Sequence, residues 1–575
     1  MVIEYKLSKQ KVTGAHFTPT ELAKFVANRV IQYLEEEQKR NIRVLDPCCG
    51  DGELLLAFHK GAKANGIHNC CLVGIEKDAH ALESAKRRMR QANCRVEWLN
   101  ADFLEMGEMQ ESLWSTGLKF DKVDVIIANP PYVRTQILGS ERAQQLAKKY
   151  SLRGRVDLYH VFLVAMTNQL MEGGLMGVIS SNRFLSTIGG ASIRGFMSQI
   201  YDVIEVIDLG DTKLFGAAVL PAVFVGRKKN SNKHTAYDGS SKAQFVRIYE
   251  DDNEVGKNLG ELDQIKSVYD ILKAPKNKKY TLGKRIYSVS TGTLHVSSKS
   301  TELWTMVTSQ EKSWIERVEN NSFCKIAEVA KVRVGIKTTA DKVFIRSDWD
   351  RLPENIRPEK DLLRPLFSHD NVARWRTSSG IDELKKVLYT HEVRNGERCA
   401  ITLDEYPQAS KYLEMHRRQL ESRKYLIEAG RNWYEIWVPQ NPLEWSIPKL
   451  IYPDISPKPK LMFDGTGCIV DGNCYWITLR VGVDPDVLFL ILGLANSRLM
   501  KHYHDLSFQN RLYAGRRRYL TQYVSLYPLP RFDSEISKEI VRLAKMLSLE
   551  KLIPEKQNRF EDKIDSLVCS AFEAS

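Results

Sequence analysis

The sequence lacks a long hydrophobic run. No uninterrupted apolar stretch among its 575 residues approaches the roughly 20 that a helix needs to cross a bilayer. The opening stretch MVIEYKLSKQK also lacks the apolar core of a secretion signal. Both absences argue against a membrane-spanning or exported protein. We therefore expect the chain to stay in the cytoplasm and to have no membrane partner.

The sequence also lacks cysteines at the spacing of a metal site. The chain has 10 cysteines, but none stands in the C-x-x-C spacing that is typical of a zinc site. Cys48 and Cys49 are adjacent, as are Cys70 and Cys71, and neighbouring cysteines are poor disulfide partners. We expect reduced, mostly buried thiols and no metal site.

Acidic residues are outnumbered by basic ones. The 84 lysines and arginines exceed the 71 acidic residues and leave a net charge of +13. This excess suits a polyanionic partner such as nucleic acid, although many unrelated proteins are equally basic. A chain of 575 residues is too long for one hydrophobic core, so two or three domains are expected.

The first part of the chain, residues 15–227, alternates between strand-like and helix-like segments. Apolar, β-branched runs are separated mostly by segments with helical periodicity, such as 54–60 and 159–171. This alternation predicts an α/β fold with a doubly wound, mostly parallel, seven-stranded sheet. The last two runs leave no room for a crossover helix, so the last strand should be antiparallel. The predicted strands are 43–46, 72–76, 95–99, 123–128, 175–180, 203–209 and 222–226.

The rest of the chain has a different character. Residues 228–244 are polar and without periodicity, which is typical of a linker. Irregular short strands, aromatic residues and basic residues follow over 245–530, which indicates an α+β region. The last forty or so residues have apolar positions at helical spacing, so they predict an amphipathic packing helix. We therefore expect three regions, 1–240, 245–530 and 531–575.

The tetrapeptide Asn129-Pro130-Pro131-Tyr132 directly follows the predicted strand 123–128. Ligands of open α/β sheets bind beyond the carboxyl ends of the strands. The prolines stiffen this loop, which holds the Asn129 amide and the Pro130 carbonyl at a set separation. Two such acceptors can accept hydrogen bonds from both hydrogens of an aromatic amine. The amine nitrogen then becomes nucleophilic toward a sulfonium methyl group. Tyr132 can stack on the face of the aromatic ring. The plain alternative is a rigid turn at a strand end.

A glycine turn follows the first predicted strand. Asp46 ends that strand, and Gly50 and Gly52 would allow close backbone approach to a ligand. The order Asp-x-x-x-Gly-x-Gly differs from the dinucleotide pattern Gly-x-Gly-x-x-Gly. S-adenosylmethionine has no pyrophosphate but carries an ammonium and a sulfonium group, so acidic residues suit it here. An ordinary strand–helix turn is the alternative.

Acidic residues also end the next two predicted strands. Glu76 stands where a carboxylate can accept both ribose hydroxyls of a bound nucleoside. Asp102 could accept from the adenine amino group of the cofactor, with Phe103 packing on the ring. Each residue alone would more often be a solvated acid or a core aromatic, but three successive strand ends together indicate a cofactor site.

With these motifs in this order, residues 14–227 resemble the gamma class of DNA adenine-N6 methyltransferases. The opening motif of that class, which helps to hold the methionine end of the cofactor, matches residues 16–23 and implies roles for Phe17, Thr18 and Pro19. Residues 154–159 and 173–175 also fit. In the family an aromatic residue near the last hairpin stacks on the flipped base opposite the catalytic tyrosine, which implies this role for Phe215. Cys48 and Cys49 depart from the commoner small residues of the glycine loop, and we interpret them as packing residues.

The resemblance continues into the second half with less specific segments, 334–344 and 362–365. It implies that 1–240 is the catalytic domain, 245–530 a DNA target-recognition domain and 531–575 a helical segment. The second region places cations beside aromatic residues, and cations neutralise phosphates while a few side chains read bases. These cations and aromatics are Arg431, Trp433, Tyr434, Trp437, Arg511, Tyr513, Arg516, Arg517, Arg518 and Tyr519.

The resemblance therefore implies an S-adenosylmethionine-dependent enzyme that methylates a flipped adenine in double-stranded DNA. It further implies a prokaryotic, nucleoid-associated restriction-modification methylase, expected as a monomer, with any cognate restriction endonuclease acting separately. The same tetrapeptide chemistry also serves cytosine N4, guanine N2 in RNA and a protein glutamine. The RNA and protein enzymes usually lack a large region after the catalytic unit, whereas more than 300 residues follow it here.

Two further classes of protein remain as alternatives. A fused nuclease and methyltransferase is disfavoured because the methyltransferase motifs start by residue 16, and because Asp454, Lys458 and Lys460 lack the intervening acid of a nuclease site. A non-catalytic specificity subunit is disfavoured because binding alone requires neither Asn129 nor Tyr132.

Overall fold

The computed structural model describes residues 17–106, 122–133, 140–153, 156–212, 220–230, 243–250, 262–296, 304–509, 511–512 and 515–573. Two compact units make up the chain. The first comprises Met1–Glu311 with Phe508–Gly515, and the second comprises Lys312–Ser507 with Arg516–Ser575. Within the described ranges, no helix is both long enough and apolar enough to span a membrane.

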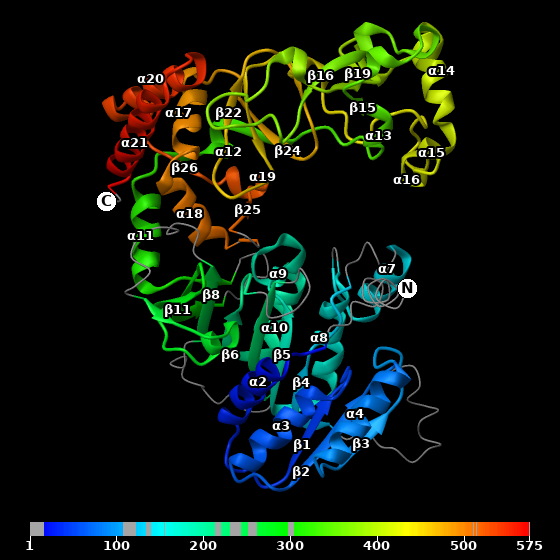
Figure 1. Ribbon diagram of the computed structural model, residues 1–575, viewed down its shortest axis with the longest axis vertical. Coiled ribbons are helices and arrows are strands. Elements are labelled where there is room, and N and C mark those ends of the chain that lie inside the picture. The colour runs from blue at the N-terminus through cyan, green and yellow to red at the C-terminus, as the bar shows by residue number, and fades with distance from the viewer. Residues whose placement is uncertain are drawn as a thin grey trace. The chain divides into compact units, whose positions relative to one another are not determined.

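The first unit contains the predicted sheet, drawn in blue to green in Figure 1. Seven strands lie in the order β3-β2-β1-β4-β5-β7-β6. Neighbours from β3 to β5 are parallel, and β7 is antiparallel to both β5 and β6. The predicted doubly wound sheet with an antiparallel last strand is thus confirmed. The strands are β1 (Ile42–Asp46), β2 (Cys70–Ile75), β3 (Val96–Leu99), β4 (Val123–Ala128), β5 (Leu170–Ser181), β6 (Tyr201–Asp208) and β7 (Pro221–Lys228).

Helices cover both faces of this sheet. Along β4, Val125 and Ile127 belong to one apolar cluster, whereas Ile126 and Ala128 belong to another. Since alternate side chains of a strand point to opposite faces, both faces are buried. The first cluster includes α2 (Thr20–Gln32), α3 (Glu53–Ala64) and α4 (Ala79–Gln91), and the second includes α8 (Leu158–Gln169) and α10 (Ala191–Ile200).

The sheet continues beyond the seven predicted strands. Strand β8 (Gln244–Glu250) pairs in parallel with β6 and antiparallel with β11 (Arg285–His295). Next follow β10 (Lys278–Leu282) and β9 (Asp263–Gln264), while β12 (Thr305–Met306) pairs with β11. The described sheet therefore has 12 strands, and the first unit extends to Glu311 rather than ending near residue 240. Most of the predicted linker at 228–244 lies outside the described residues, but Gln244 already belongs to β8.

The second unit has two four-stranded sheets over an aromatic core, and its described residues also form three two-stranded sheets. One sheet has the order β14-β24-β20-β22 and the other the order β15-β17-β16-β23. Trp349, Trp445 and Trp476 are all buried in one cluster between these elements. The strands are β14 (Ala330–Val334), β24 (Cys474–Leu479), β20 (Lys449–Pro453), β22 (Met462–Asp464), β15 (Ile345–Arg346), β17 (Lys386–Leu388), β16 (Leu363–Phe367) and β23 (Ile469–Val470).

The chain ends in two helices, α20 (Glu535–Leu549) and α21 (Pro554–Ala571). They pack on each other and on α17 (Asp486–Ala495), as the red and orange helices of Figure 1 show. Their buried residues include Ile540, Leu543 and Leu547 in α20 and Ile564 and Val568 in α21. The predicted amphipathic segment is thus helical, and it belongs to the second compact unit.

Candidate active site

The loop after β4 is held by side-chain hydrogen bonds. The Asn129 Nδ2 group donates to Thr18 Oγ1 over 3.1 Å, and the Tyr132 hydroxyl donates to Asn129 Oδ1 over 2.6 Å. Thr18 lies just before α2, so the opening motif and the tetrapeptide meet although 111 positions separate them. The sequence predicted both motifs but did not predict that they are joined.

Burial keeps the Tyr132 hydroxyl neutral. Pro130 is buried, and Asn129 and Tyr132 are half-buried. Burial raises the pKa of Tyr132 well above its ordinary value, because the phenolate would lose its hydration. The hydroxyl therefore remains a hydrogen-bond donor at neutral pH.

The turn after β1 has the backbone conformation that its glycines predict. Gly50 has φ +54° and Gly52 has φ +80°, both in the left-handed region that favours glycine. A Cβ atom on Gly52 would lie 3.1 Å from the Cβ of Ala85 in α4. The ring of Phe17, which is 60% exposed, would lie 3.5 Å from a Cβ on Gly50. The opening motif thus also borders this turn.

Glu76 links the turn to the end of β2. Its Oε2 accepts from the Gly50 backbone N–H over 2.9 Å, and its Oε1 accepts from the Asp78 N–H over 2.9 Å. These bonds fix the carboxylate beside the glycine turn. Each oxygen retains a second lone pair that can accept a further hydrogen bond.

Asp46 is buried beneath the same turn, with only 1% of its surface exposed. Its Oδ1 accepts from the Cys48 backbone N–H over 3.2 Å. Burial raises the pKa of Asp46 to about 8, against the effect of the Cys48 hydrogen bond, and the negative charge of Glu76 adds to the rise. The group is therefore mostly neutral at pH 7, and a nearby cation would favour its ionised form.

The end of β3 carries Asp102 and Phe103. Asp102 is half-buried, accepts from the Leu104 N–H over 3.1 Å and lies 3.7 Å from the Lys77 ammonium. Phe103 is only 8% exposed and stacks on Phe162 of α8, with 6.0 Å between ring centroids. Phe103 is thus fixed within the core on the α8 face of the sheet.

Cys48 packs against the tetrapeptide loop. Burial raises the pKa of its thiol well above the ordinary value, while the Asn129 backbone hydrogen bond acts in the opposite direction. Cys49 is buried, and all 10 cysteines are free thiols. Only four of the 10 are buried and the other six are half-buried, so the expectation of mostly buried thiols is wrong, while Cys48 joins the glycine turn to the Asn129 loop.

A further polar cluster at this edge of the sheet was missed from the sequence. Asp208, which ends β6, accepts from Asn182 Nδ2 over 3.1 Å, from the Gly210 N–H over 3.0 Å and from the Tyr249 hydroxyl. The Arg511 guanidinium lies 5.5 Å from the centroid of the Tyr249 ring. The available signal was the position of Asn182 and Asp208 at strand ends. Phe215, the predicted stacking aromatic, lies outside the described residues, as do His16, Gly154 and Arg155.

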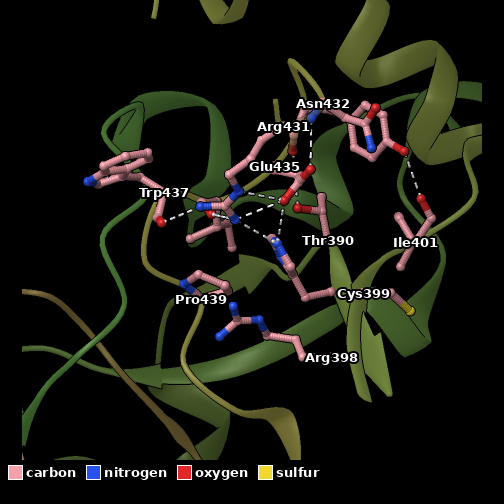
Figure 2. Close-up of polar contacts among 12 residues, drawn as sticks. Thr390, Arg398, Cys399, Ile401, Arg431, Asn432, Glu435, Trp437 and Pro439 are labelled. Atoms are coloured by element: carbon pink, nitrogen blue, oxygen red, sulfur yellow. Dashed lines mark hydrogen bonds and ion pairs between the residues drawn. The ribbon is translucent and has the colours of Figure 1, made fainter. Parts of the chain in front are cut away.

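The second unit corrects part of the expected set of phosphate-binding cations. Figure 2 shows Arg431 turned inward, where its Nε donates to Glu435 Oε2 over 2.8 Å and one terminal nitrogen donates to the Trp437 carbonyl over 2.6 Å. Arg517 is buried and pairs with Asp505. Both guanidinium groups are therefore occupied by internal partners. Arg516, in contrast, is exposed.

No group of three or more histidine, cysteine or acidic side chains that could hold a metal ion occurs in the part of the chain that the structure describes. The arrangement at the sheet edge is therefore a set of hydrogen-bond acceptors, a glycine turn and buried carboxyl groups. Such a set can bind a cationic nucleoside and orient an amine.

Comparison with known proteins identifies the family of the chain. Residues 69–215 match the model of the Eco57I restriction-modification methylase family. The type II methyltransferase M.BanIII of Aneurinibacillus aneurinilyticus is 47% identical over 580 residues, which cover 100% of this chain and 99% of the relative. This chain belongs to the type II methyltransferase family.

One more distant relative matches most of the length of this type II methyltransferase. M.BstVI of Geobacillus stearothermophilus is 24% identical and covers 94% of this chain and 93% of its own. Among solved structures, the DrdV–DNA complex has a TM-score of 0.52 and 12% identity, over 94% of this chain and 58% of that one. This likeness shows a shared fold that includes both compact units.

Proposed function

We propose that the protein is an S-adenosylmethionine-dependent DNA methyltransferase that modifies the exocyclic N6 amine of adenine. The observation that carries the proposal is the position of Asn129, whose amide oxygen lies at the sheet edge in a loop bonded to Thr18 and packed on Cys48. The family membership of the chain supports the methyltransferase part of this proposal.

In this proposal Asn129 Oδ1 and the Pro130 carbonyl accept the two hydrogens of the target amine. Amine hydrogens held in this way draw the nitrogen lone pair out of conjugation with the ring, so the nitrogen becomes nucleophilic. Tyr132 stacks on the base, and Phe215 is proposed to lie on the opposite face. No general base is required, because the methylated amine sheds its proton readily.

The residues at the neighbouring strand ends fit S-adenosylmethionine. Asp46 is a buried carboxyl whose raised pKa would be lowered by the cofactor ammonium, and the fixed Glu76 oxygens can accept from ribose hydroxyls. When bound, this cofactor supplies a methyl group on an electrophilic sulfonium. The residues proposed to hold it are Phe17, Thr18, Pro19, Asp46, Gly50, Gly52, Glu76, Asp102 and Phe103.

Double-stranded DNA is the proposed substrate. The amine of a paired adenine is buried in the duplex, so the base must rotate out of the stack to reach Asn129. The net charge of +13 supports a polyanionic partner. We assign catalysis to residues 1–240, target recognition to 245–530 and packing to 531–575. Action as a cytoplasmic, nucleoid-associated monomer beside a separate cognate endonuclease stays a prediction.

The test uses the full chain, labelled S-adenosylmethionine and duplex DNA from a methylation-free host. Digestion to nucleosides should yield labelled N6-methyladenine, and sequencing of the modified DNA should give the recognition site. N4-methylcytosine as the only product would contradict the adenine assignment, and cleavage of the DNA would indicate a fused nuclease.

Asn129→Ala separates the chemistry from cofactor binding. We expect it to retain the cofactor affinity of the wild type and to lose turnover by at least about 100-fold, as removal of a group that acts in the transition state does. The matched control is Asn69→Ala, since Asn69 is exposed and its side chain has no hydrogen bond within the described residues. Equal loss of cofactor binding and turnover in Asn129→Ala would contradict the proposed role.

A further inference from the structure

Thr18, Asn129 and Tyr132 form a continuous hydrogen-bonded chain. The Tyr132 hydroxyl donates to one end of the Asn129 amide, and the other end of that amide donates to Thr18. We propose that Thr18 is a positioning residue for Asn129, and that the Tyr132 hydroxyl occupies the acceptor oxygen of Asn129 until the target amine displaces it. This inference rests on the proposed methyl transfer and gives Thr18 a second role beside cofactor binding.

Thr18 is itself held rigidly. The residue before a proline is restricted to extended conformations, and Pro19 directly follows Thr18. Pro19 is the N-cap of α2, which packs against α3 and β5. A hydroxyl fixed to the framework in this way can determine the direction of a side chain that bonds to it.

The two ends of an asparagine amide are chemically different. One end is an NH2 donor and the other is a carbonyl acceptor. An amine substrate requires the acceptor end, and rotation of the amide by half a turn would present a donor instead. Because Thr18 Oγ1 accepts from Nδ2, the bond directs Oδ1 away from α2 and toward Tyr132.

The Tyr132 hydroxyl resembles the target group. It is a neutral donor attached to an aromatic ring, as is the amine of adenine, and it donates to the oxygen that the amine is proposed to use. In the free enzyme this bond supplies a hydrogen-bond donor to the half-buried carbonyl of Asn129. If Oδ1 accepted from the Tyr132 hydroxyl and the target amine at once, its hydrogen bond to the amine would be weaker. The Tyr132 hydroxyl therefore leaves Oδ1 as its ring stacks on the base.

The first experiment tests Thr18. Thr18→Val removes the acceptor with little change in shape, whereas Thr18→Ser keeps it. We expect the valine variant to lower kcat at saturating cofactor by about 10- to 100-fold, which weaker cofactor binding alone would not produce, and the serine variant to restore most of kcat. The control is Thr20→Val, because Thr20 is exposed and its side chain makes no hydrogen bond within the described residues.

Two outcomes would overturn the role of Thr18. A weakened cofactor Kd with an unchanged kcat at saturation would make Thr18 a cofactor ligand only. Valine and serine variants that both match the wild type would remove it from the mechanism. If Thr18→Val does not fold, Thr18→Ala removes the same acceptor hydroxyl and takes its place, with the same expected fall in kcat and the same restoration by Thr18→Ser.

The second experiment tests Tyr132. Tyr132→Phe keeps the stacking ring but removes the competing donor, so the KM for a short duplex carrying the recognition site should fall by about five-fold. Tyr33→Phe is the control, since Tyr33 is half-buried and its hydroxyl has no hydrogen bond within the described residues. A KM that is unchanged or higher in Tyr132→Phe would overturn the inference.

Failure of the inference and failure of the proposed function are distinguishable. If the wild type transfers no methyl group to adenine, the proposed function is wrong. If the wild type methylates adenine but the Thr18 and Tyr132 variants behave as their controls do, only the inference is wrong.

Discussion

The backbone N–H of Gly50 donates to the carboxylate of Glu76 over 2.9 Å. One hydrogen bond thus joins the turn after β1 to the end of β2, although 26 positions separate the two residues. The carboxylate proposed to bind ribose is therefore also part of the support of the glycine turn.

Glu76→Ala should chiefly weaken the cofactor. The change removes a ribose acceptor and frees the Gly50 N–H, so we expect the Kd for S-adenosylmethionine to rise by at least about 10-fold, as loss of a charge-assisted hydrogen bond implies. Isothermal titration measures this, and kcat at saturating cofactor should change much less. Glu83→Ala, on the exposed face of α4, is the control. An unchanged cofactor Kd would refute the assignment.

The stability of the protein should depend on pH through Asp46. The folded pKa is about 8 against an ordinary value of 3.8, so between these values the folded state holds a proton that the unfolded chain releases. The free energy of unfolding therefore falls as pH rises from about 4 to about 8, and this contribution is constant above that. Relative to Asp46→Asn, the wild type should lose Tm across this window. A constant difference in Tm from pH 5 to 9 would contradict the prediction.

Gly52→Ala should destabilise the first unit more than Gly66→Ala does. Both glycines have positive φ, at +80° and +76°, so each substitution carries a left-handed strain of about 1–2 kcal/mol. Only at Gly52 does the new Cβ also crowd Ala85 at 3.1 Å, whereas Gly66 has nothing within 4 Å. Urea denaturation of both variants measures the difference. Equal losses of unfolding free energy in the two variants would show that Ala85 of α4 moves aside at no energetic cost.

Glu435→Ala should destabilise the second unit. Glu435 is buried and accepts hydrogen bonds from Arg431 and from the Asn432 N–H, so its removal leaves the guanidinium without its carboxylate. Breaking a fully buried pair costs about 3–5 kcal/mol, and since the Arg431 side chain is partly exposed we expect a smaller loss of about 1–3 kcal/mol. Chemical denaturation followed by tryptophan fluorescence measures the loss, and the exposed Glu428→Ala is the control. A loss no larger than that of the control would mean that water replaces the carboxylate.

Local patterns explain how far the sequence predicts this fold. The seven strands from β1 to β7 were predictable because each is a short apolar run and helical periods separate most of them. The site motifs were predictable for the same reason, since Asp46, Glu76, Asp102 and Asn129 all follow such runs. Parallel strands place these residues at one edge whatever the details of packing.

Long-range pairing explains what the sequence does not predict. Strand β8 extends the same sheet, but a short run of apolar residues after a polar stretch is equally typical of the start of a new domain. Likewise, Arg431 stands among aromatic residues in the sequence, and only the position of Glu435 and the Trp437 carbonyl shows that it faces inward. The bonds of Asn129 to Thr18 and Tyr132 depend on side-chain directions that no pattern encodes.

The return of Phe508–Gly515 to the first compact unit has a consequence for building chimaeras from relatives of this family. A hybrid made with a single crossover at residue 311 would take the body of the first unit from one parent and this short piece from the other. Arg511 beside Tyr249 would then be mismatched between parents. A functional exchange of the second unit should therefore use three crossovers, after residues 311, 507 and 515. Residues 508–515 then come from the same parent as the first unit.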